Sequence, residues 1–256
     1  PDLLLCGKHS QWFTSPRIDT RNTHGTGCTL SSAIAGYLAR GCALPQAVEY
    51  AKTYVQNTIR AADELDVGRC FESASKELGS VQILVNNAGV GKSAPFHRME
   101  TNLWNEIIGL NLTGTYLCTK QVFSEMRESG YGRIVNISST VGLRGYPYIA
   151  AYCASKHGVI GLTRTLALEC VKKGITVNAI CPGYTDTDLV SEAVDAIVEK
   201  TGKDRTEIQS EIDNMSPMGR MVTPDEVAET VAWICLPSSA SITGQSIVVS
   251  GGAVMH

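Results

Sequence analysis

A tyrosine and a lysine stand four positions apart in the segment AAYCASKHGVIGLTRTLALE, residues 150–169. Side chains at i and i+4 are neighbours on one face of a helix, so Tyr152 and Lys156 are expected to lie together. A phenol titrates at about pH 10 in water, and a nearby ammonium lowers its pKa by favouring the phenolate. The pair is therefore either a tuned proton donor or a polar stripe. Other features of the sequence are needed to distinguish the two.

Three short apolar segments are predicted as buried parallel strands, each ending in a polar or glycine-containing turn: VQILVNNAG (81–89), GRIVNISS (132–139) and ITVNAICPG (175–183). Ligands bind outside the carboxyl ends of the strands in such a sheet. Ser139 ends one strand and Tyr152 begins the helix that follows, so both are expected to face one crevice.

The remaining elements after residue 70 alternate with these strands. Helical patterns are predicted over roughly 100–129, over 148–173 with Gly174 as the stop, over 186–214 as a flap, and from Thr223 with Pro224 and acidic residues in the first turn; a last strand is predicted over 244–252. Repeated strand–helix units predict an α/β fold with three layers, α/β/α, around a parallel sheet.

The first 69 residues follow a different pattern, which we interpret as β-β-α-α. A short strand precedes a glycine-rich turn, and helices are expected over roughly 27–40 and 45–63. The two patterns meet near residues 66–71 without a Pro/Gly/Ser-rich linker. We therefore expect two parts, 1–69 and 70–256, packed as one body.

Composition excludes several classes of protein. The chain has 256 residues, 43% of them hydrophobic, and a net charge of −3, so the basic surface of a nucleic-acid binder is absent. No apolar run is long enough to span a membrane, and no signal peptide is expected. Nine cysteines, an odd number without a C-x-x-C pair, predict reduced thiols in a cytoplasmic protein and no metal site.

Residues 70–256 resemble the short-chain dehydrogenase/reductase family. The resemblance rests on motifs in order: NNAG (86–89), NISS (136–139), YCASK (152–156), CPG (181–183) and TGQSIVVSGG (243–252). Within that family they are similar to 3-oxoacyl carrier-protein reductases, polyketide ketoreductases and small secondary-alcohol dehydrogenases. The resemblance implies a Rossmann-like fold, NAD or NADP as cofactor, a ketone, alcohol or acyl substrate, and a homo-oligomer, dimer or tetramer.

The resemblance also implies roles for individual residues. Tyr152 would be the general acid in reduction and the base in oxidation, and Lys156 would lower its pKa and bind the nicotinamide ribose. Ser139 would bind the substrate carbonyl and Asn111 would hold a water that links Lys156 to solvent. The cofactor cleft would further be lined by Asn87, Ala88 and Gly89, and its nicotinamide end by Pro182, Gly183 and Thr187.

The N-terminal third departs from this family's pattern. The T-G-x-x-x-G-x-G turn that cradles the cofactor pyrophosphate occurs nowhere in the sequence. Residues 1–69 instead resemble the C-terminal part of hydroxymethylpyrimidine-phosphate kinases, which are ribokinase-like, so the chain looks chimeric. In that resemblance the GTGC turn forms an anion hole, and we hypothesise that Gly25, Gly27 and Cys28 replace the missing phosphate loop.

Three functions remain open on this evidence. The first is an NAD(P)-dependent oxidoreductase of the short-chain type, favoured by Asn111, Ser139, Tyr152 and Lys156 together. The second is a crippled chimera without a competent cofactor site, and the third is a phosphotransferase remnant that uses GTGC. Arg144 is interpreted as an exposed surface charge, with approach to an acidic substrate group as the alternative.

Overall fold

A computed structural model describes residues 2–6, 9–13, 46, 48–49 and 67–255, which belong to two compact units, Pro1–Gly79 and Ser80–His256. In the first unit, β1 (Asp2–Cys6) and β2 (His9–Phe13) form an antiparallel hairpin, and α3 (Val67–Leu78) is a helix. The sequence did not predict α3. The helices expected over 27–40 and 45–63 lie almost entirely outside the described residues.

The second unit is built on a parallel sheet, as the sequence predicts. Its strands lie in the order β3 (Ile83–Asn86), β4 (Gly132–Ile137), β5 (Ile175–Pro182) and β6 (Ser246–Val249). Each strand begins and ends within the segment predicted for it. The predicted segments extend further because their last residues, such as Ser139, already belong to the turns that follow.

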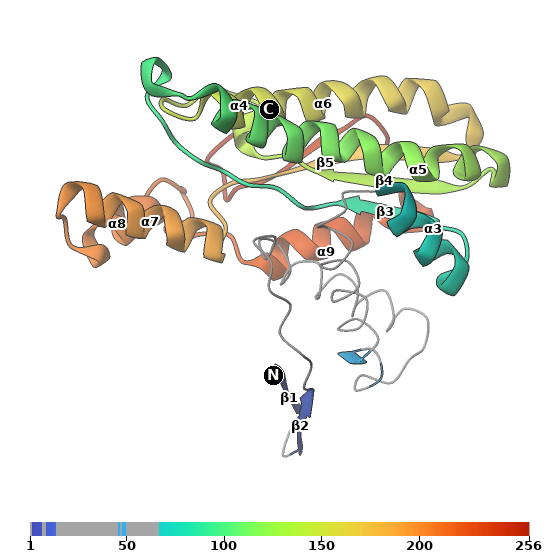
Figure 1. Cartoon of the computed structure of the whole chain (residues 1–256), viewed down its shortest axis with the longest axis horizontal. Coiled ribbons are helices and arrows are strands. Elements are labelled where there is room, and N and C mark those ends of the chain that lie inside the picture. Colours follow the sequence, from blue (N-terminus) through green and yellow to red (C-terminus); the bar gives the residue numbers. More distant parts are fainter. Residues whose placement is uncertain (1, 7–8, 14–45, 47, 50–66, 256) are drawn as a thin grey trace. The chain divides into compact units, whose positions relative to one another are not determined.

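Helices cover both faces of this sheet (Figure 1). One face carries α4 (Thr101–Ile108), η2 (Gly109–Thr113), α5 (Gly114–Ser129), α6 (Ala150–Cys170) and η4 (Val171–Lys173); the other carries α9 (Pro224–Cys235). The prediction of three layers is thereby confirmed. Two further helices, α7 (Asp188–Thr201) and α8 (Arg205–Asp213), pack against each other in the segment predicted to be helical.

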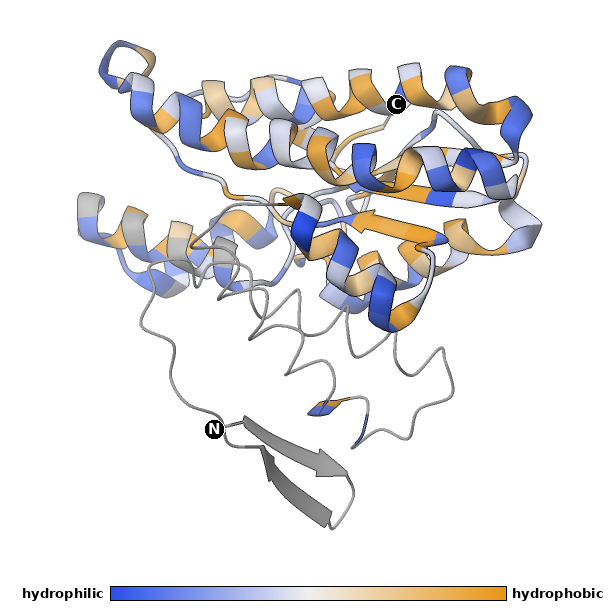
Figure 2. Cartoon of the chain, turned by 45° about the vertical axis from the view of Figure 1, so that its right-hand side comes forward, coloured by the Kyte–Doolittle hydropathy of each residue, from blue (hydrophilic) through white to orange (hydrophobic). Residues whose placement is uncertain are grey.

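The core lies along the strands of this sheet. Figure 2 shows the hydrophobic strands enclosed between helices that turn hydrophilic residues outward. Val135, Ile180 and Ile234 form one fully enclosed cluster between the sheet and α9. The start of α9 matches its prediction, because Thr223 and Glu226 form a reciprocal capping box there.

A buried polar network also joins the layers. The Asn86 amide donates to Asn136 Oδ1 (2.8 Å) and Thr119 Oγ1 (3.0 Å), and the Asn136 amide donates to Thr163 Oγ1 (2.9 Å). Two strands and two helices are thereby held together by satisfied hydrogen bonds. Such bonds fix the register between layers, since an unpaired buried amide costs about 1–3 kcal/mol.

Glycine ends the helix that the sequence predicts to stop at residue 174. Gly174 follows η4 at φ +71°, in the left-handed region, and a Cβ there would overlap the carbonyl oxygen of Gly130. Gly202 ends α7 at φ +68°, but a Cβ there would meet open space. The two glycines share a conformation and differ in surroundings.

Membrane-spanning helices and metal-binding clusters are both absent from the described part of the chain. No helix in it is both long and apolar enough to cross a membrane, and no group of His, Cys, Asp and Glu could hold a metal ion. Six cysteines between residues 67 and 255 are free thiols: Cys70, Cys118, Cys153, Cys170, Cys181 and Cys235.

Candidate active site

Ser139 lies at the carboxyl end of β4, where η3 (Thr140–Gly142) begins. Its hydroxyl accepts a hydrogen bond from the Val141 amide (3.2 Å) and donates a long one to the Pro182 carbonyl at the end of β5 (3.4 Å). The hydroxyl is therefore held at the edge of the sheet where two neighbouring strands end.

Tyr152 and Lys156 occupy successive turns at the start of α6, as their spacing predicts. The ammonium of Lys156 lies 5.7 Å from the centre of the Tyr152 ring. It is almost fully buried, at 4% exposure, and donates a hydrogen bond to the Ile137 carbonyl (2.7 Å). A lysine ammonium has three N–H groups, so others remain for a ligand.

Burial dominates the ionisation of both residues. It raises the pKa of the Tyr152 phenol, while a hydrogen-bonding interaction with the Ser139 side chain acts in the opposite direction. Burial also lowers the pKa of Lys156 to about 8, against the influence of Cys181, which raises it. The sequence argument expected Lys156 to lower the pKa of Tyr152. The net direction here is upward, because desolvation of the phenolate outweighs its neighbours.

Asn111 is buried in η2, a π-helical turn between α4 and α5. Its side chain accepts from the Val90 amide (2.9 Å) and donates to the Val90 carbonyl (2.9 Å) and to the Ser155 hydroxyl (3.1 Å). Asn111 therefore ties the loop after β3 to the helix that carries Tyr152 and Lys156. π-Helical turns are frequent at functional sites.

Glycines bring these residues close to one another. A Cβ on Gly89 would lie 3.1 Å from Asn111 Oδ1 and 3.5 Å from Lys156 Nζ. A Cβ on Gly91 would lie 3.7 Å from the Tyr152 ring. The loop after β3 therefore passes next to both Tyr152 and Lys156, and a side chain at Gly89 would crowd the Asn111 side chain.

The other predicted residues occupy the same end of the sheet or its surroundings. Asn87 and Ala88 directly follow β3 and precede Gly89. The Gly183 amide donates to the Val249 carbonyl (2.9 Å), which joins the ends of β5 and β6. Thr187 is exposed at the start of α7 and donates to the Thr185 carbonyl (3.2 Å), and it makes no hydrogen bond to the other described site residues. Gly25, Gly27 and Cys28 lie outside the described residues.

Four residues around the site escaped the sequence analysis. Val90 and Ser155 hold Asn111, and the Ser138 hydroxyl donates to the Lys156 carbonyl (3.0 Å). Cys181 is fully buried and interacts with Ser138, Ser139 and Lys156. Ser138, Ser155 and Cys181 each stand next to a predicted residue in the sequence, but the contacts depend on the fold.

The chain is similar in sequence and in structure to several known reductases. The sequence matches the family described as enoyl-(acyl carrier protein) reductase over residues 37–254, so the match begins ahead of residue 70. The chain is 40% identical over 241 residues to an acetoacetyl-CoA reductase of Shinella zoogloeoides, covering 91% of this chain and 95% of that protein. An acetoacetyl-CoA reductase of Rhizobium meliloti is 46% identical over 176 residues, 69% of each. A solved structure, a tryptophan variant of actinorhodin polyketide ketoreductase with NADPH, superposes with a TM-score of 0.71 at 39% identity, covering 73% of this chain and 72% of that one.

Proposed function

This chain belongs to the short-chain dehydrogenase/reductase family, and from that premise we propose that it reduces the ketone of a 3-oxoacyl-type substrate with Tyr152 as the general acid. The observation that carries the proposal is the cluster of Ser139, Tyr152 and Lys156 at the carboxyl end of the sheet. NAD or NADP is the cofactor of this enzyme class, and when bound it supplies the hydride.

The residues present fit the nicotinamide ribose of such a cofactor. The backbone of Gly89 lies open beside Lys156 Nζ, where a side chain would fill the space. Lys156 uses one N–H on the Ile137 carbonyl, so another can donate to a ribose hydroxyl. Asn87, Ala88, Pro182, Gly183 and Thr187 would line the rest of the cleft. Gly25, Gly27 and Cys28 remain our candidates for the pyrophosphate end.

Proton transfer follows from the ionisation of Tyr152. Burial raises its pKa, so the phenol is protonated at neutral pH and can donate its proton to the carbonyl oxygen of the substrate. As a donor, the Ser139 hydroxyl makes a long bond to the Pro182 carbonyl, so its proton can turn toward the same oxygen. We infer that the enzyme favours reduction near neutral pH, and that oxidation, which needs the phenolate, increases at alkaline pH.

The test combines cofactor binding with turnover. NADH and NADPH are titrated into the protein and into Tyr152→Phe and Lys156→Ala by fluorescence, and reduction of acetoacetyl-CoA is then followed. Tyr152→Phe should bind cofactor but lose at least about a hundredfold in kcat, because it lacks the acid. Lys156→Ala should bind cofactor more weakly. Failure of the wild-type protein to bind either nucleotide would leave the crippled chimera as the better description.

Two finer features also belong to the proposal. We infer that the chain forms a dimer or tetramer in a cytoplasmic, reducing compartment. We also keep the interpretation of residues 1–69 as a ribokinase-like segment, with a phosphotransferase remnant that uses GTGC as the alternative function. Incubation with ATP and hydroxymethylpyrimidine phosphate tests that alternative, because only a phosphotransferase would give a phosphorylated product.

A further inference from the structure

A cation and two phenols gather beside the proposed reaction centre. Arg144 and Tyr146 lie in the loop between β4 and α6, and the guanidinium of Arg144 is 4.6 Å from the centre of the Tyr146 ring. Both residues act on the third, Tyr184: Tyr146 adds to the effect of burial, which raises the pKa of the Tyr184 phenol, and Arg144 opposes it. The three side chains are therefore close enough to influence one another.

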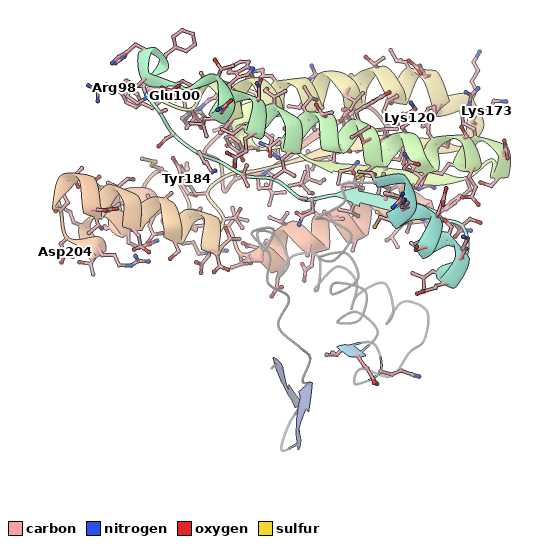
Figure 3. The ribbon with its side chains drawn as sticks, in the orientation of Figure 1. Arg98, Glu100, Lys120, Lys173, Tyr184 and Asp204 are labelled. Atoms are coloured by element: carbon pink, nitrogen blue, oxygen red, sulfur yellow. The ribbon has the colours of Figure 1, made fainter. Side chains whose placement is uncertain are left out.

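The backbone places this cluster at the carboxyl end of the sheet. Tyr184 stands two residues after Pro182, whose carbonyl accepts from the Ser139 hydroxyl, and its own carbonyl accepts from the Val222 amide (2.9 Å). Arg144 follows Ser139 by five residues, and its amide donates to the Thr140 carbonyl (3.3 Å). Figure 3 shows Tyr184 on the side of the sheet that faces α7 and α8, and Lys173 at the opposite end of the α6 layer.

The charge of Arg144 has no carboxylate partner among the described residues. Some exposed cations of the same unit are paired, for example Arg220 with Glu226, whereas Lys120 and Arg127 lie over aromatic rings as Arg144 does. What distinguishes Arg144 is its position beside the carboxyl end of the sheet. The Arg144 side chain is exposed, its guanidinium lies over the ring of Tyr146, and it makes no hydrogen bond to another described residue. An arginine stacked on an aromatic ring is held in place and can offer two parallel N–H groups to an anion.

We propose that Arg144, stacked on Tyr146 beside Tyr184, binds a negatively charged group of the substrate at a distance from the ketone. Carboxylate and phosphate present the same paired oxygens to a guanidinium. The substrate class is therefore a 3-oxo compound with a distal anion, either the carboxylate of a free oxo acid or the phosphates of a thioester carrier. The assignment of a 3-oxo substrate rests on the proposed function. The binding of an anion by Arg144 does not depend on it.

The test compares Arg144→Gln with Lys173→Gln, a matched loss of one positive charge at the other end of α6. Calorimetry measures binding of coenzyme A, and kinetics measure KM for acetoacetyl-CoA, for acetoacetate and for the neutral ester ethyl acetoacetate. We expect Arg144→Gln to weaken coenzyme A binding about tenfold. The KM for an anionic substrate, divided by the KM for ethyl acetoacetate, should rise by a similar factor. Both effects should shrink at high salt. Lys173→Gln should change neither.

A second pair of variants tests the stacking. Tyr146→Phe keeps the ring and should retain the preference for the anion, whereas Tyr146→Leu removes the ring and should lose a part of it. A rise in the KM ratio for acetoacetyl-CoA alone assigns the phosphates, and a rise for acetoacetate alone assigns the carboxylate. Equal changes for all three substrates, or none, overturn the proposal.

The two proposals fail separately. A chain that reduces ethyl acetoacetate while Arg144→Gln leaves the KM ratio and coenzyme A binding unchanged keeps the proposed function and loses the assignment of Arg144. A chain that reduces no ketone, but whose affinity for coenzyme A falls in Arg144→Gln, keeps the anion site and loses the proposed reaction.

Discussion

Lys156 combines burial with charge, and its ionisation should be visible in stability. Burial holds its pKa at about 8, against 10.5 in the unfolded chain. Below pH 8 the lysine is charged in both states. Between pH 8 and pH 10.5, Lys156 is neutral in the folded state and still charged in the unfolded chain. The free energy of unfolding of the wild type should therefore rise with pH relative to that of Lys156→Met, by about 3 kcal/mol across this range.

Urea denaturation of both proteins from pH 7 to 10.5 measures this difference. Lys173→Met is the matched control, because Lys173 is exposed and its loss should give a curve parallel to the wild type. If the Lys156→Met and wild-type curves also run parallel across the window, the buried ammonium is not desolvated as described.

At the residue scale the sequence predicted which side chains meet and left out what holds them. Helical spacing was sufficient to place Tyr152 next to Lys156, and strand ends were sufficient to place Ser139 near Pro182. The pairing of Asn111 with the Val90 backbone joins positions 21 apart and depends on the fold. The direction of the pKa of Tyr152 also depends on burial, which spacing does not report.

At the scale of elements, the two helix-ending glycines make a controlled comparison. Gly174→Ala should destabilise the protein by about 3–4 kcal/mol, because it combines left-handed strain with a clash against the Gly130 carbonyl. Gly202→Ala introduces the same strain into open space and should cost only about 1–2 kcal/mol. Chemical denaturation of both variants gives the two values, and equal values would mean that the loop at Gly130 relaxes freely.

Predictability of the elements followed the strength of their boundary signals. Thr223, Pro224 and the acids after them define a helix start, and α9 begins there. Gly174 likewise marked the end of the helix predicted over 148–173. The helix α3 was missed because its residues straddle the point near 66–71 where two patterns were thought to meet. The strands are shorter than predicted, since the predicted segments included the polar and glycine residues of the turns that follow, such as Ser139.

At the scale of the whole molecule, exposed apolar side chains on α5 and α6 support self-association. Leu168 is 82% exposed on α6, and Tyr116 is 46% exposed on α5. Leu168→Glu would place a charge in an interface formed by these helices. It should shift the protein toward the mass of one chain in light scattering, at a concentration where the wild type is oligomeric.

Ile197→Glu is the control for that measurement, because Ile197 is exposed on α7, away from these helices. It should leave the mass unchanged. Retention of the oligomer by Leu168→Glu, together with its loss in Ile197→Glu, would move the interface to α7.

The π-helical turn of η2 has a consequence for how this chain can change over generations. A π turn holds one residue more than an α turn, so the 109–113 segment behaves as a single-residue insertion in an otherwise continuous helix. Deleting any one of its residues would restore the α-helical phase and rotate α4 by about 100° relative to α5. Ile107 would leave the core and Asn111 would lose Val90 together. Lineages that carry this turn can therefore exchange its residues other than Asn111, but a deletion here would be inherited only alongside a second compensating change.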